Sequence, residues 1–208
     1  MIDFTCPQCG SPFTVSDHLA GRRARCRKCQ TAIEIPAPAS GSSAGSSIGA
    51  KISPRHRRLL ADFEQMKRAF TDFPFIRIRA AHGDPVETYE LEYFVRGLAR
   101  MPGRTEPIER SYHCVEIKLG LDYPRLGPRC RMLTPVFHPN IEPATICIGD
   151  HWTAGERLVD LCVRIGEMIA FQAYNIQSPL DAEAAMWADL HVKKLPVDDR
   201  NLRPGENA

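Results

Sequence analysis

The spacing of apolar side chains divides most of the chain into helical and extended stretches. Ser53-Pro54 supplies a helix cap followed by a first-turn proline. Apolar residues then recur every three or four positions, at Leu59, Phe63, Met66 and Phe70. This spacing predicts an amphipathic helix that begins near Pro54.

After Pro74 the apolar period changes to two. Apolar and polar residues alternate over 76–79, 88–96 and 115–119, and a weaker run covers 130–134. Such runs, separated by Gly and Pro turns, predict short strands that most simply form a meander.

The helical period returns in two later stretches. One stripe consists of Leu158, Leu161, Cys162, Ile165, Met168 and Ile169. A second follows Ser178-Pro179, where Asp181 completes a start like a capping box. Its members are Leu180, Ala184, Trp187 and His191. One helix, about four grouped strands, an irregular stretch and two helices together predict an α+β fold.

The overall charge limits the classes of partner. The chain has 208 residues, with 27 Lys and Arg against 25 Asp and Glu, so its formal charge is only +2. This balance argues against nucleic acid as the main partner. No apolar run approaches the roughly 20 residues that span a bilayer, and no basic region leads into an apolar stretch at the N-terminus. We therefore expect a soluble, cytoplasmic protein that does not enter a membrane.

The composition changes sharply along the chain. Four of the eight cysteines lie within the first 29 residues. Residues 36–50 carry no charge and are mostly Pro, Ala, Gly and Ser, so they bury too little apolar surface to offset the entropy of ordering. We predict a small module over 1–35, a flexible linker over 36–50, a second domain over 51–195 and a C-terminal tail over 196–208.

The N-terminal cysteines form two matched pairs, Cys6/Cys9 and Cys26/Cys29, separated by sixteen residues. Two turns that each offer a pair of thiolates can close a tetrahedron around one Zn²⁺. Disulfides do not suit the cytoplasmic interpretation, and a thioredoxin-type redox pair needs a single CxxC in a βαβ context. We predict one structural zinc ion, because four thiolates leave no open position for water or substrate.

Residues 4–35 resemble small bacterial zinc-ribbon modules, which carry a Cys-Pro-x-Cys-Gly knuckle, a Leu-Ala-Gly-Arg turn and a second CxxC. Here the turn is Leu19-Ala20-Gly21-Arg22, and Gln30 replaces a glycine that often follows the second knuckle. The module also has a small basic face, which either contacts phosphates or is a solvated face that offsets the thiolate charge. Its residues are Arg22, Arg23, Arg25, Arg27 and Lys28.

The irregular stretch after the strands brings a histidine, an asparagine and a cysteine within ten residues: His138, Asn140 and Cys147. A cysteine in a loop followed by Gly149 can be exposed and act as a nucleophile. A nearby amide can donate a hydrogen bond to an oxyanion. From the spacing alone, these residues can equally be a core histidine, a turn residue and a small buried apolar side chain.

The same region resembles the ubiquitin-conjugating enzyme family, whose hallmark is His-Pro-Asn followed shortly by Ile-Cys-Leu bearing the catalytic cysteine. His138-Pro139-Asn140 and Ile146-Cys147-Ile148 match it in order and kind. Further matches are Tyr123-Pro124, Pro128, Trp152, Asn175 and Ser178-Pro179-Leu180. The resemblance covers most of 53–194. It implies a UBC-like fold, with an N-terminal helix, a four-stranded antiparallel meander, an active-site loop and C-terminal helices, here preceded by the small zinc ribbon.

The resemblance also implies roles for four residues. Cys147 would carry a ubiquitin-like protein as a thioester, and Asn140 would either stabilise the oxyanion or order the loop that does so. His138 would hold the active-site loop, and Ser178 would help to position the incoming amine. Arg55, Arg57 and Arg58 match the surface that family members present to the activating enzyme, although a solvated helix face explains them equally well.

The active-site loop departs from the family pattern. The intervals from Asn140 to Cys147 and from Cys147 to Trp152 are both shortened, and Gly149 stands where Asp is common. We therefore expect a remodelled loop. Asp150 and His151 follow the cysteine and either supply a local base or form an exposed turn.

The resulting hypothesis is a prokaryotic-type ubiquitin-like protein conjugating enzyme, an acyltransferase that needs a separate activating enzyme and an amine acceptor. A catalytically silent UBC-fold module that only binds ubiquitin-like proteins is the main alternative, but the presence of Cys147 argues against it. A zinc-ribbon nucleic-acid-binding protein is a third possibility, and the near-neutral charge argues against it.

Overall fold

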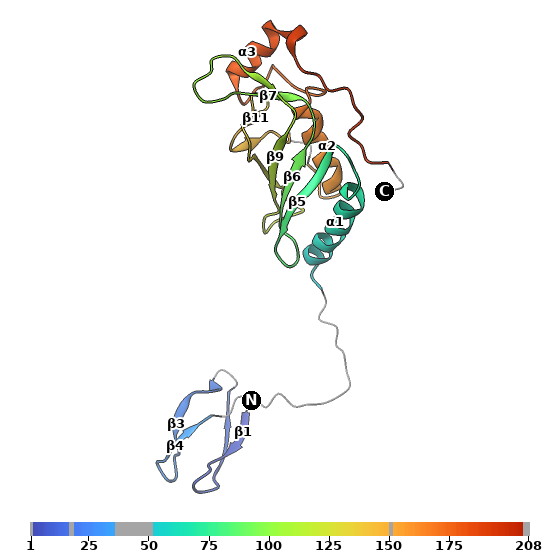
Figure 1. The fold of residues 1–208 in the computed structure, drawn as a ribbon. Helices are drawn as coiled ribbons and strands as arrows, with labels where there is room; N and C mark the ends of the chain where they lie inside the picture. The colour runs from blue at the N-terminus through green and yellow to red at the C-terminus, as the bar shows by residue number, and fades with distance from the viewer. Residues whose placement is uncertain (1, 17–18, 36–51, 150–151, 206–208) are drawn as a thin grey trace. The chain divides into compact units, whose positions relative to one another are not determined.

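The computed structural model describes residues 2–16, 19–35, 52–149 and 152–205 (Figure 1). The chain divides into two compact units, Met1–Ala50 and Lys51–Ala208. The predicted linker 36–50 lies outside the described residues. None of the described helices is long and apolar enough to cross a membrane.

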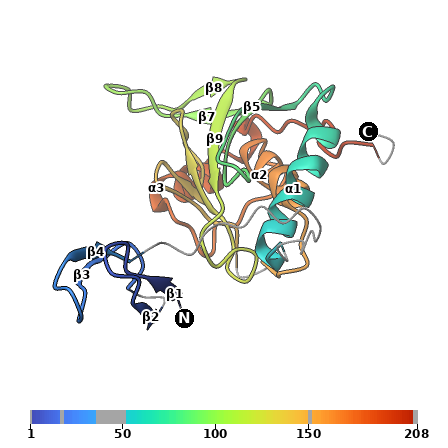
Figure 2. The same ribbon diagram turned by 90° about the horizontal axis from the view of Figure 1, so that it is seen from below.

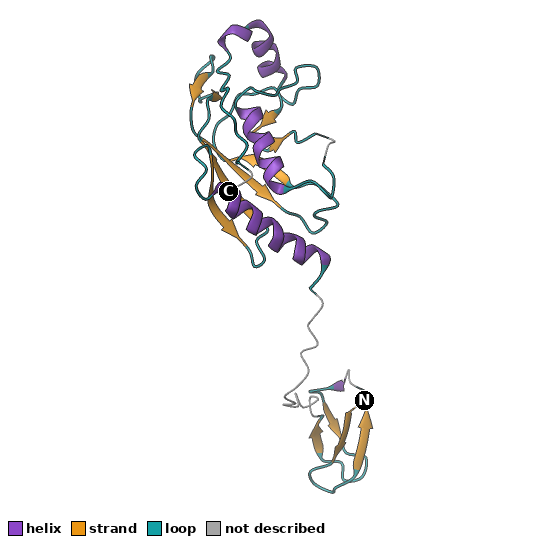
Figure 3. Cartoon of the chain, turned by 90° about the vertical axis from the view of Figure 1, so that its right-hand side faces the viewer, coloured by secondary structure: helices purple, strands orange, loops and turns teal. Residues whose placement is uncertain are grey.

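The smaller unit consists of two antiparallel hairpins (Figure 3). Strand β1 (Ile2–Thr5) pairs with β2 (Pro12–Val15), and β3 (Arg23–Arg25) pairs with β4 (Ala32–Glu34). Its core is small: Cys6, Cys26 and Ile33 are buried, and the rings of Phe4 and Phe13 stack with centroids 5.6 Å apart. So small an apolar core rarely stabilises a fold without a metal or a disulfide.

The larger unit is built on the predicted meander. Strands β5 (Ile76–His82), β6 (Thr88–Tyr93), β9 (His113–Lys118) and β10 (Arg129–Met132) form one sheet in the order β10-β9-β6-β5, and every neighbouring pair is antiparallel. A short hairpin, β7 (Gly97–Ala99) with β8 (Ile108–Arg110), is inserted between β6 and β9. Its three-residue strands are too short to give a period-two signal, so the sequence pattern did not predict them.

Three α-helices occur among the described residues: α1 (Pro54–Phe70), α2 (Leu158–Ile169) and α3 (Ala182–Leu190). The Ser53 hydroxyl caps α1 as predicted by accepting from the His56 amide at 3.1 Å. The start of α3 differs from the prediction. Asp181 is itself the N-cap and accepts from the Ala184 amide at 2.9 Å, so Leu180 lies outside the helix. A 3-10 turn, η2 (Val192–Lys194), follows α3.

Helices α1 and α2 lie side by side along the sheet (Figures 1 and 2), and the main core fills the space between helices and strands. The apolar faces of α1, α2 and the sheet meet there, including Leu59, Met66, Leu91, Ile117, Leu161 and Ile165. Cys114, Cys130 and Cys162 are buried, as the apolar periodicity predicted. Burial raises the pKa of the Cys130 thiol to about 12, so this group stays protonated.

The C-terminal segment up to residue 205 packs on the larger unit rather than extending as a separate tail. Leu202 is fully buried in the main core. Asp198 accepts from the Arg96 amide at 2.9 Å, and the Arg200 guanidinium beside it lowers the pKa of the Asp198 carboxyl to about 2. Leu202 and Asp198 together hold this C-terminal segment on the larger unit, although its sequence has no regular apolar period.

Candidate functional site

The four N-terminal cysteines converge at one end of the two hairpins. Their sulfur atoms all lie within 4.8 Å of one another, and the Sγ–Sγ distances of Cys6 to Cys29 and of Cys9 to Cys26 are both 3.7 Å. Zn–S bonds of about 2.3 Å in a tetrahedron place neighbouring sulfurs about 3.8 Å apart. These residues therefore fit a tetrahedral metal ion with four thiolate ligands.

Matching backbone turns present the two cysteine pairs. The Gly10 amide donates to the Cys6 carbonyl at 2.9 Å, and the Gln30 amide donates to the Cys26 carbonyl at the same distance. Gly10 has φ 69° and Gln30 has φ 60°. Gln30 thus adopts the left-handed conformation that a glycine takes more easily, at a cost of about 1–2 kcal/mol. The departure from the ribbon pattern leaves the ligand geometry intact.

A short hairpin, with two residues in each strand, positions the candidate cysteine of the larger unit. Strand β11 (Ile141–Glu142) pairs with β12 (Thr145–Ile146), and both isoleucines are buried. Asn140 precedes β11 and Cys147 follows β12, so the pairing sets them opposite each other. The Cys147 amide donates to the Asn140 carbonyl at 3.0 Å. Cys147 is exposed, whereas the other three cysteines of this unit are buried.

His138 is a buried structural residue. Its Nδ1 accepts from the Asn140 amide at 3.0 Å, and its ring lies 4.7 Å from the Phe171 ring between centroids. Burial lowers the pKa of His138 to about 3, so the imidazole is neutral near pH 7. A neutral ring that accepts at Nδ1 carries its proton on Nε2. This geometry holds the His-Pro-Asn turn in place.

The side chain of Asn140 joins this turn to the loop after α2. Its Nδ2 donates to the Asn175 carbonyl at 2.7 Å and lies 3.5 Å from the Ser178 carbonyl, while its Oδ1 accepts from the Asn175 amide at 2.6 Å. The Pro139 carbonyl accepts from the Leu180 amide at 2.8 Å. Because Nδ2 and Oδ1 of Asn140 are both hydrogen-bonded to backbone groups, its side-chain amide orders this loop.

A cavity of about 350 Å³ opens beside the cysteine. It brings together three of the four predicted site residues, Asn140, Cys147 and Ser178, while the buried His138 is not among its lining residues. The other lining residues are Ile148, Gly149, Arg164, Met168, Ala173, Tyr174 and Asn175. Sequence reasoning missed Arg164 and Tyr174. Arg164 interrupts the apolar run of α2, which was a usable signal, whereas nothing in the pattern distinguished Tyr174. Asp150 and His151 lie outside the described residues.

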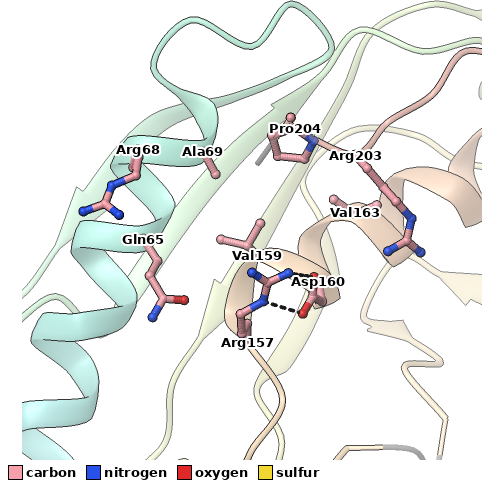
Figure 4. Close-up of a pocket in the computed structure, with 10 residues that line it drawn as sticks. Gln65, Arg68, Ala69, Arg157, Val159, Asp160, Val163, Arg203 and Pro204 are labelled. Carbon is pink, nitrogen blue, oxygen red and sulfur yellow. Dashed lines mark hydrogen bonds and ion pairs between the residues drawn. The ribbon is translucent and has the colours of Figure 1, made fainter. Parts of the chain in front are cut away.

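A larger cavity, of about 510 Å³, lies elsewhere, between α1, α2 and the C-terminal segment (Figure 4). It contains none of the predicted site residues. Its central charges are already paired, since the Arg157 guanidinium makes two contacts of 2.8 Å with the Asp160 carboxylate. The smaller cavity is therefore the one with the chemistry of a reactive site.

The segment after Cys147 is anchored by the first helix and the proline-rich loop. The Trp152 indole donates to the Pro124 carbonyl at 2.8 Å. Arg58 donates to the Ala154 carbonyl at 2.6 Å and to the buried Asp62 carboxylate at 2.8 Å, and the Tyr123 hydroxyl donates to the same carboxylate. Arg58 is thus an internal structural residue rather than part of an open basic face.

Comparisons with known proteins agree with this geometry. The model of the ubiquitin-conjugating enzyme family matches residues 87–194, just over half of the chain. The chain therefore belongs to the ubiquitin-conjugating enzyme family.

Two individual proteins extend the comparison. The SUMO-conjugating enzyme UBC9 of Caenorhabditis elegans is 29% identical over a 91-residue alignment, which covers 40% of this chain. The chain spans only about half (54%) of that relative's length. A crystal structure of a Plasmodium yoelii protein assigned as a ubiquitin conjugating enzyme is similar in fold, with a TM-score of 0.50 at 19% identity. That similarity covers 70% of this chain and 92% of the other.

Proposed function

We propose that this chain carries a ubiquitin-like protein as a thioester on Cys147 and transfers it to an amine acceptor. The observation that supports this most directly is the placement of Cys147. It is the exposed cysteine of the larger unit, and it shares a cavity with Asn140 and Ser178 beside the His-Pro-Asn turn. An exposed thiol can form the thiolate and be reached by a large acyl donor.

The proposed reaction consists of two acyl transfers without a change of oxidation state. The Cys147 thiolate attacks the thioester carbonyl on a separate activating enzyme, and the thiolate of that enzyme leaves. An acceptor amine then attacks the new thioester, loses its proton to solvent, and expels the Cys147 thiolate as the amide forms. Asn140 orders the loop around this site, and Ser178 at the cavity mouth helps to position the amine.

We also propose that the cysteines of the smaller unit hold one structural zinc ion. The thiolates of Cys6, Cys9, Cys26 and Cys29 would be its ligands, and the ion would supply the folding energy that the small core lacks. The predicted organisation, a ribbon over 1–35 joined by the linker 36–50 to the catalytic domain, is part of the same proposal.

The test combines the purified chain with ATP, an activating enzyme and a ubiquitin-like protein from the same source, followed by electrophoresis without reductant. Wild type should form an adduct that a thiol reductant removes, and Cys147→Ala should form none. Cys147→Ser should form an oxygen ester that resists the reductant. Cys130→Ala, which changes a buried thiol, is the matched control and should load normally. A wild-type chain that forms no adduct, as expected of a silent binding module, would refute the proposal.

A further inference from the structure

Arg164 is the one fixed charge among the described residues that line the cavity beside Cys147. It lies in α2, one turn before Met168, and both side chains reach the cavity from the same face of the helix. The neighbouring positions of α2, Val163 and Ile165, are buried in the apolar core. An arginine at this position is therefore not explained by packing.

The two edges of the Arg164 guanidinium differ in their contacts. Nη1 lies 2.9 Å from Oε1 of Glu156, whose side chain is only 12% exposed, so the charge is compensated. Nε and Nη2, which together form the other edge, are shielded from solvent and have no acceptor among the described residues. Buried donors are nearly always hydrogen-bonded in native proteins. This edge therefore leaves two donors for an acceptor that lies outside the described residues.

The charge balance indicates what kind of acceptor fits. Glu156 already neutralises Arg164, so a second carboxylate would place two anions on one guanidinium. Neutral carbonyl oxygens can accept from Nε and Nη2 without that repulsion. Because the guanidinium ends a flexible side chain, rotation about its last torsions can present this edge to the cavity.

We propose that Arg164 binds backbone carbonyl oxygens in the C-terminal segment of the acyl donor. This inference rests on the proposed function, because the residues that precede a thioester on Cys147 begin beside the cavity that Cys147 and Arg164 both line. Holding that segment fixes the orientation of the thioester carbonyl toward the incoming amine. Orientation of this kind accelerates the transfer step itself.

The test is single-turnover discharge of the preformed Cys147 adduct onto the amino acid lysine. Arg164→Leu and Arg164→Lys should both discharge about tenfold more slowly, the usual effect of losing a hydrogen bond from a charged donor. In Arg164→Lys, the new ammonium group can keep the ion pair with Glu156 but has nothing equivalent to the Nε and Nη2 edge. Glu156→Gln removes the ion pair, keeps that edge, and should discharge at close to the wild-type rate.

Thermal unfolding of the free protein separates this role from a structural one. Because Nε and Nη2 lack an acceptor in the free chain, Arg164→Lys, which can keep the ion pair with Glu156, should melt close to the wild-type temperature. An Arg164→Lys variant that loses several degrees along with its rate would overturn the inference, as would normal discharge by that variant. Absence of any wild-type adduct would refute the proposed function as well, whereas normal loading with normal discharge would overturn the Arg164 inference alone.

Discussion

Replacement of Asn140 by alanine should destabilise the larger unit by a predictable amount. The residue is 6% exposed, and its side chain makes two short hydrogen bonds to the backbone of Asn175, at 2.7 and 2.6 Å. Each such bond contributes about 1 kcal/mol net, so Asn140→Ala should cost about 2 kcal/mol. For a domain of this size the loss corresponds to a decrease of about 4–8 °C in Tm.

Asn140→Asp provides a sharper form of the same test. It keeps the acceptor for the Asn175 amide but replaces the donor with an oxygen that faces the Asn175 carbonyl. The new carboxylate would also be almost fully buried, so the cost should exceed that of alanine and reach about 3 kcal/mol. Thermal and urea unfolding of the full chain, followed by circular dichroism, would measure both variants.

Asn175→Ala is the matched control, because Asn140 contacts only the backbone of Asn175. The Asn175 side chain is exposed and accepts from the Gln177 amide at 2.8 Å, so its loss should cost less than 1 kcal/mol. An Asn140→Ala variant that melts within 1 °C of wild type, or an Asn140→Asp variant more stable than Asn140→Ala, would refute the assignment of Asn140 as the link between the two loops.

Three further predictions concern the metal, pH and the first helix. Metal analysis should find one zinc per chain that Cys9→Ser loses, and a chain without bound zinc would contradict the site. Burial lowers the pKa of His113 to about 4 and that of His138 to about 3, against about 6.5 in the unfolded chain. As the pH falls, the unfolded chain therefore protonates these two histidines at a higher pH than the folded chain does. The free energy of unfolding should be constant above pH 6.5 and fall below it by about 1.4 kcal/mol per pH unit for each histidine, and His138→Gln should reduce that slope in urea titrations. An unchanged slope in this variant would refute the assignment. Arg58→Ala leaves the Asp62 carboxylate buried without its guanidinium and should cost on the order of 3 kcal/mol, part of which Asp62→Asn should recover; additive effects of the two changes would contradict a coupled pair.

The fold was largely predictable because its long elements have regular periods and strong boundary signals. The Ser53 cap with Pro54 located α1, and alternation located the four strands that form the sheet. The missed features lack such signals. Strands β7 and β8 are three residues each, and Leu202 reaches the core from a segment without any period. Tertiary contact, rather than local pattern, places these residues.

Sequence motifs identified the region of the candidate site but not the contacts within it. The motif containing His138 and Asn140 left open whether the amide acts on an oxyanion or on the loop. Only the hydrogen bonds to Asn175, thirty-five residues away, favour the loop. In Arg164, likewise, Nη1 pairs with Glu156 while Nε and Nη2 have no acceptor among the described residues. No local sequence pattern encodes the position of Glu156 that produces this difference.

Intact mass spectrometry of the chain after reaction with ATP, the activating enzyme and the ubiquitin-like protein tests the central claim most directly. A thioester on Cys147 adds the mass of one ubiquitin-like protein less one water, and peptide mapping should place it on Cys147. Hydroxylamine should remove the added mass, because it cleaves thioesters under mild conditions. An unchanged mass for wild type, or the same adduct on Cys147→Ala, would contradict the account.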